Sequence, residues 1–172
     1  EEQRFGVNDK EKLKQLTSLN VLTLSATPIP RTLHMSLSGI RDISIIATPP
    51  VGRLPITTIV TEENDMMLKD AITRELSRDG QVLIINDKVE NLPAIAKRVT
   101  DISGEEIEIA HGQMDKKDIE KAMLKMYNQQ SKILLATSLI ENGIDLPKSN
   151  TLIVLNSDRF GLSQLYQMRG RV

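Results

Sequence analysis

The sequence contains no cysteine and no tryptophan, and its 172 residues include only two Tyr and two Phe. Without cysteine, a disulfide framework and a zinc site built on thiolates are both excluded. Only His34 and His111 could supply imidazole ligands, and their separation makes a histidine-based zinc site improbable. The scarcity of aromatic rings argues against nucleic-acid recognition by base stacking.

The chain also lacks an excess of positive charge, since 22 Lys and Arg face 23 Asp and Glu for a formal net charge of −1. A globally basic nucleic-acid binder is therefore excluded. A protein that holds phosphates with backbone amides and a few hydroxyls can still be near neutral, so DNA remains a compatible ligand. No apolar run approaches the about 20 residues of a membrane span, and no signal-peptide pattern opens the chain. We expect a cytoplasmic protein without membrane partners, and the start without Met indicates a piece of a longer one.

Strand-like apolar runs alternate with segments of helical period, which is typical of an α/β fold. In the first third of the chain we expect strands at 21–24 and 43–46 and a helix from about 31 to 38. The stretch rich in proline and glycine at 48–55 is the best candidate for a linker.

After this stretch the alternation becomes regular. The pattern predicts strands at 56–60, 82–85, 107–110, 133–136 and 151–155, and helices at 64–78, 89–100 and 115–128. The last of these helices is the most amphipathic, with apolar residues at helical spacing from Ile119 to Tyr127. Strands separated by helices of this length need crossover connections, so the sequence predicts a parallel sheet.

Polar residues and glycine gather after the later strands. Thr137 directly follows the strand at 133–136, and a glycine flanked by two arginines, Arg169 and Arg171, lies near the end of the chain. Open parallel sheets place ligands beyond the carboxyl ends of their strands, and paired guanidinium groups suit a phosphate. These residues predict a nucleotide-dependent site.

Six motifs, in order and spacing, resemble the superfamily-2 helicases and translocases, whose motor consists of two RecA-like lobes. They are EEQRFGV (1–7), LSATPIPRT (24–32), RDISIIATPP (41–50), HGQM (111–114), TSLIENGID (137–145) and GLSQLYQMRGR (161–171). The resemblance covers essentially the whole chain. It is strongest to the family of transcription-repair coupling factors, which the run at 42–50 favours over the RecG-type helicases.

The resemblance implies a RecA-like parallel sheet with flanking helices. Residues 56–172 would form the second motor lobe, truncated within its motif VI. Residues 49–55 would be the interlobe linker, and residues 1–48 the C-terminal part of the first lobe.

The resemblance also implies an ATP site that uses Mg²⁺. Glu1 would be the catalytic base that orients and deprotonates the attacking water, and Arg171 the arginine finger that stabilises charge on the γ-phosphate. The implied ATP-binding residues are Gln3, Gly143, Asp145, Gln167 and Arg169. From the residues alone, a charged terminus is the favoured interpretation of Glu1, and only the match of the flanking residues reverses it. Arg171 has its own alternative as a basic helix end favoured by the helix dipole.

The implied DNA contacts lie on other motifs. Thr137 would touch the DNA backbone, and His111 with Gly112 and, more weakly, Asn86 would lie along the DNA path. The run Ser25, Ala26 and Thr27 would couple the nucleotide state to the grip on DNA. Each of these has a plain structural alternative as a cap or a strand-end turn.

As a whole, the resemblance implies an ATP-dependent translocase on double-stranded DNA. Such a protein displaces stalled RNA polymerase and couples transcription to nucleotide excision repair, binding RNA polymerase and excision-repair proteins through regions outside these residues. The phosphate loop, the magnesium-binding Asp and the second Gly-Arg of motif VI are expected outside the chain, so the chain alone is expected to be inactive. A RecG-type helicase for branched DNA and a non-catalytic helicase-like binding module are the alternatives.

Overall fold

The computed structural model describes residues 54–137, 146 and 148–172, together with the single residues 44, 46, 48, 51 and 52. The chain divides into two compact units, Glu1–Leu54 and Pro55–Val172. The elements expected at 21–24 and 31–38 lie outside the described residues, and so do parts of the strand expected at 43–46. Ser44 and Ile46 are described, and neither lies in a strand. The division into a first lobe, a linker and a second lobe stays a prediction.

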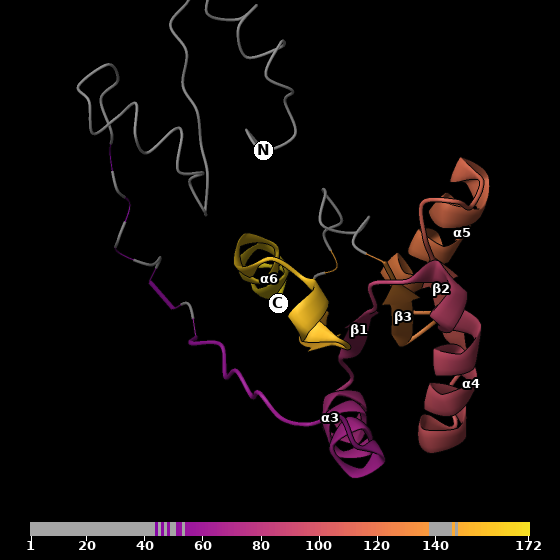
Figure 1. The fold of residues 1–172 in the computed structure, drawn as a ribbon, viewed down its shortest axis with the longest axis horizontal. Helices are drawn as coiled ribbons and strands as arrows, with labels where there is room; N and C mark the ends of the chain where they lie inside the picture. The colour runs from indigo at the N-terminus through magenta and orange to yellow at the C-terminus, as the bar shows by residue number, and fades with distance from the viewer. Residues whose placement is uncertain are drawn as a thin grey trace, which may run out of the picture. The chain divides into compact units, whose positions relative to one another are not determined.

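Four parallel strands form the sheet of the second unit (Figure 1). They are β1 (Gln81–Ile85), β2 (Ile107–Ala110), β3 (Ile133–Ala136) and β4 (Ser149–Val154). Their order across the sheet is β2-β3-β1-β4, and all three pairings are parallel. The predicted α/β class and parallel sheet are confirmed, and β2 and β3 have the predicted bounds.

The helices are α3 (Asp65–Ser77), the short 3-10 turn η2 (Val89–Asn91) leading into α4 (Leu92–Ser103), α5 (Lys116–Tyr127), and the turn η4 (Ser157–Arg159) before α6 (Leu162–Arg169). Helices α4 and α5 connect strands of the sheet, α3 precedes β1, and α6 follows β4. The start of α3 is capped by Asn64, whose Oδ1 accepts a 2.8 Å hydrogen bond from the N–H of Met67. At the end of α4, Gly104 takes the left-handed conformation with φ 73°. The helices predicted at 64–78 and 115–128 are confirmed to within one residue at each end.

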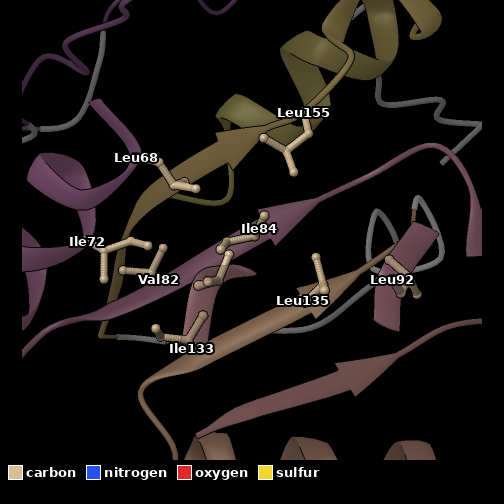
Figure 2. Close-up of a cluster of buried hydrophobic side chains, with 9 residues drawn as sticks. Leu68, Ile72, Val82, Ile84, Leu92, Ile133, Leu135 and Leu155 are labelled. Atoms are coloured by element: carbon tan, nitrogen blue, oxygen red, sulfur yellow. The ribbon is translucent and has the colours of Figure 1, made fainter. Parts of the chain in front are cut away.

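The central strand β1 is buried on both faces. Val82 and Ile84 point to one face, where they pack against α3 and α4 (Figure 2). Leu83 and Ile85 point to the other face, where Met126 of α5 and Met168 of α6 cover them. Each aliphatic side chain buried in this way stabilises the fold by roughly 1.5–3 kcal/mol. The sheet is thus a rigid, doubly covered platform for the residues that follow its strands.

The prediction of a strand at 56–60 is wrong. These residues form no strand, and Ile59 and Val60 are 66% and 90% exposed. The prediction relied on a run of β-branched residues. Such residues favour a strand only when a neighbouring strand and a buried surface receive them, and within the described residues this run has neither.

Candidate functional site

The residues that follow the four strands lie next to one another at the carboxyl end of the sheet. Ile85 is in register with Ala136 of β3 and with Val154 of β4, and Ala110 of β2 is in register with Ala136. The ladder continues one residue further, since the N–H of Asn86 donates to the carbonyl of Ala136 at 2.9 Å. We call the polar residues at this end of the sheet the carboxyl-end row: Asn86, His111, Thr137 and Asn156.

Thr137 ends β3, and its side chain is 7% exposed. Its backbone N–H donates to the carbonyl of Ala110 at 3.3 Å, so this group is already used inside the sheet. Of the two groups that the sequence offers for a phosphate contact, the hydroxyl is therefore the better placed.

His111 forms a tight turn at the end of β2. Its Nδ1 accepts a 3.3 Å hydrogen bond from the N–H of Gln113, and its carbonyl accepts one of 3.1 Å from Met114. With Nδ1 as the acceptor, the neutral ring carries its proton on Nε2. Gly112 in this turn is exposed and has no side chain that could cover His111. The His111 ring can therefore donate its N–H to an anionic oxygen.

Asn86 is fully buried, and both sides of its amide are used within the protein. Its Nδ2 donates to the carbonyl of Lys88 at 2.9 Å, and its Oδ1 accepts from Nδ2 of Asn156 at 3.1 Å. Direct contact of Asn86 with DNA stays a prediction, and its burial counts against it. The bonds indicate a residue that holds two loops together.

Asn156 is the member of the row that the sequence did not single out. It has a left-handed backbone with φ 50° and ψ 47°, a conformation that asparagine tolerates better than most residues. Its Nδ2 also lies 3.3 Å from Oδ1 of Asp87. An asparagine after a strand hints at a left-handed turn, but a partner 70 positions away cannot be read from one sequence.

Helix α6 presents the arginine motif. Met168 is 3% exposed and anchors the helix in the core, whereas Arg169 and Arg171 are exposed. The guanidinium carbon of Arg169 lies 5.5 Å from the ring centroid of Tyr166, within range of a cation–π contact. Gln167, between these residues, is half-buried. The end of the helix and the turn after it thus offer two planar cations of the kind that bind phosphate oxygens bidentately.

The remaining predicted site residues lie outside the described part of the chain. They are Glu1, Gln3, Ser25, Ala26, Thr27, Gly143 and Asp145. Within the described residues, no three His, Asp or Glu side chains gather where they could hold a metal ion. No described helix is long and apolar enough to cross a membrane.

Comparison with known proteins places this arrangement in a family. Residues 64–172 match the family described as the helicase conserved C-terminal domain. The chain belongs to this family. The resemblance to superfamily-2 helicases is thereby confirmed.

Among curated relatives, this chain is similar to the transcription-repair-coupling factors of Staphylococcus epidermidis and Staphylococcus aureus. In both cases 52% of residues are identical over 174 aligned residues, which cover 100% of this chain and 15% of the relative. The chain therefore spans 15% of the length of these relatives. The predicted resemblance to the coupling-factor family is confirmed.

Two solved structures share the fold. RecG bound to a three-way DNA junction has a TM-score of 0.69 and 28% identity, covering 90% of this chain and 23% of that one. Dbp5 of S. cerevisiae bound to RNA and ADP BeF3 has a TM-score of 0.59 and 16% identity, covering 95% of this chain and 45% of that one. These likenesses confirm the predicted RecA-like helicase fold.

Proposed function

We propose that this chain belongs to an ATP-dependent translocase on double-stranded DNA, of the transcription-repair-coupling type. The observation that carries the proposal is the 52% identity to coupling factors over 100% of the chain. Residues 56–172 serve as the larger part of the second motor lobe, and residues 1–48 as the end of the first.

The proposed ATP site uses α6. Bound ATP, with Mg²⁺, supplies the phosphoanhydride whose hydrolysis drives movement. Arg171 stabilises the charge that develops on the γ-phosphate, while Gln167 and Arg169 orient the phosphates. The exposure of both arginines supports these roles, because a finger must reach phosphate oxygens. Glu1 as the base, with Gln3, Gly143 and Asp145 at the nucleotide, completes the proposed site.

The proposed DNA track uses Thr137, His111 and Gly112 at the carboxyl end of the sheet. The Thr137 hydroxyl and the Nε2–H of His111 donate to phosphate oxygens, and Gly112 lets the backbone approach closely. Such contacts position the duplex without reading its sequence, so binding should be independent of sequence. Ser25, Ala26 and Thr27 relay the state of the nucleotide to this track.

RNA polymerase and excision-repair proteins are the proposed partners, on the strength of the relatives' name, and the cytoplasm is the proposed compartment. The chain contains no G-x-x-x-x-G-K-[ST] phosphate loop. The 172 residues alone are thus expected to show no Mg²⁺-dependent ATP hydrolysis, and the test requires the full-length translocase.

The test compares two DNA substrates. Full-length protein and ATP are added to RNA polymerase stalled on a duplex, and release of the transcript is followed on a gel. In parallel, the same protein is given a three-way DNA junction and strand separation is measured. We expect ATP-dependent release of the polymerase and little unwinding of the junction.

The RecG-type alternative predicts the reverse result. It has an observation in its favour, the TM-score of 0.69 to RecG bound to a junction, although the identity there is 28%. The alternative of a non-catalytic binding module predicts no hydrolysis with or without duplex DNA. Either result would contradict the proposed function.

A further inference from the structure

A pair of asparagine amides joins the loop after β1 to the segment that leads from β4 into α6. We propose that Asn156 is a positioning residue that transmits DNA contact at Thr137 to Arg169, the last residue of α6, and to Arg171 in the turn that follows. This inference rests on the proposed function and adds to it a residue that neither the motifs nor the comparisons assign.

Asn86 occupies the middle of this connection. Its backbone N–H donates to the carbonyl of Ala136, the residue directly before Thr137, at 2.9 Å. Its Oδ1 accepts from Nδ2 of Asn156 at 3.1 Å. Because Asn86 is 0% exposed, its Oδ1 cannot turn to water in place of this partner.

Asn156 is the second residue of this connection. The N–H of Leu155, directly before it, donates to the carbonyl of Ile85 at 2.9 Å, which fixes where the segment leaves the sheet. The left-handed backbone of Asn156 then turns the chain into η4 and onward to α6. Its Nδ2 lies 3.3 Å from Oδ1 of Asp87, so a single NH₂ group holds two successive residues of the β1 loop.

These hydrogen bonds and backbone links form a short path along which a movement of the β3 end can be transmitted. A shift of the β3 end when Thr137 contacts DNA reaches Asn86 through the ladder, and Asn156 through its amide. From Asn156 the chain continues into α6, whose last residue is Arg169, and Arg171 follows in the turn directly after the helix. Loss of the amide should therefore weaken the stimulation of hydrolysis by DNA and leave the basal rate unchanged.

Two variants of the full-length translocase test this. Asn156→Asp keeps the size and the tolerance for a left-handed backbone, but places a carboxylate against the oxygens of Asn86 and Asp87. Asn156→Gly keeps the backbone conformation and removes the amide. We expect the ratio of duplex-stimulated to basal ATP hydrolysis to fall by about 2-fold to 30-fold in both.

The matched control is Asn150→Asp, on the exposed part of β4, where Nδ2 donates to the carbonyl of Lys148 at 3.3 Å. This change should leave the ratio unaltered. Thermal unfolding midpoints identify a variant that is merely unstable; if Asn156→Asp is unstable, Asn156→Gly decides.

A double variant sharpens the test. If Thr137 and Asn156 act along one route, Thr137→Ala combined with Asn156→Gly should show the same ratio as Thr137→Ala alone. Two results would overturn the inference while leaving the proposed function intact. In one, the effects of the two substitutions on the ratio multiply; in the other, a stable Asn156 variant shows a normal ratio. A parent protein whose hydrolysis is not stimulated by DNA would refute both.

Discussion

The two ends of the parallel sheet are built differently. At the amino end, Asp79 lies between two lysines, with Nζ of Lys132 at 2.6 Å and Nζ of Lys148 at 2.9 Å from its carboxylate oxygens. Lys148 also donates to Oε1 of Gln129 at 2.8 Å. At the carboxyl end, the row consists of amides, an imidazole and a hydroxyl.

Buried polar groups near the amino end of the sheet add to this contrast between its two ends. Gln81, at the start of β1, donates from Nε2 to the carbonyls of Met126 and Ser131 at 2.7 and 2.9 Å. Glu75 of α3 is 1% exposed and accepts from Thr151 of β4 and from Arg78. These bonds tie helices and loops to the sheet. The comparison indicates that the amino end maintains the fold, and we propose that the carboxyl end presents groups to ligands.

The largest effect should come from the arginine motif. In the full-length protein, Arg171→Ala should lower the ATP turnover by about a thousandfold or more and leave ATP binding largely intact, if the proposed role holds. The reason is that a finger acts on charge that develops in the transition state, so little ground-state affinity is lost. Turnover is measured by phosphate release and affinity with a fluorescent nucleotide. Near-normal turnover would refute the role of Arg171.

A smaller, more selective effect is expected at Thr137. Thr137→Ala should lower the duplex-stimulated rate by about tenfold or more, because a hydrogen bond to a charged phosphate is lost, while the basal rate stays near normal. Thr137→Ser, which keeps the hydroxyl, is the control. Equal loss of basal and stimulated rates would mean that Thr137 does not act through DNA.

At the amino end the expected effect is on stability. Thr151→Ala removes a hydroxyl that donates to the buried carboxylate of Glu75, and should lower the free energy of unfolding by about 1–3 kcal/mol. Urea titration of the 172-residue chain measures this loss. Thr58→Ala, at an exposed position outside the sheet, should leave the urea midpoint unchanged.

The smallest effect concerns pH. Hydrogen bonds from Lys132, and then from Lys148, lower the pKa of Asp79 from 3.8 to about 2. The unfolded chain therefore binds more protons in this range, so the contribution of Asp79 is present above pH 3.8 and is lost as the pH falls towards 2. Asp79→Asn, which tolerates the φ of 59°, should flatten the pH dependence of the urea midpoint between these values. An unchanged slope would contradict the ion pairs, and high salt should weaken the effect in the parent chain.

Much of the fold could be predicted from local pattern. The helix around Ile119 and Met126 was predictable because its apolar face repeats at helical period, and β3 because four apolar residues are followed by a polar one. The strand at 56–60 failed because its residues need a partner strand, which no local pattern reveals. The bounds of α6 were not predicted either, and its weakly patterned sequence, held in the core by Met168, explains this.

The site was predictable in part. Position after a strand correctly indicated that Thr137, His111 and Asn86 share one edge, since parallel strands end together. Position could not indicate that Asn86 is buried or that its partner is Asn156. Those facts depend on the order of the strands, which places β4 beside β1.

The most direct measurement compares two threonines at opposite ends of the sheet. Thr137→Ala and Thr151→Ala are made in the full-length protein, and for each the ratio of duplex-stimulated to basal hydrolysis is measured alongside the unfolding midpoint. A functional carboxyl end and a structural amino end predict that Thr137→Ala lowers the ratio and keeps the midpoint, while Thr151→Ala lowers the midpoint and keeps the ratio. The opposite pattern, or the same change in both variants, would contradict this division of the molecule.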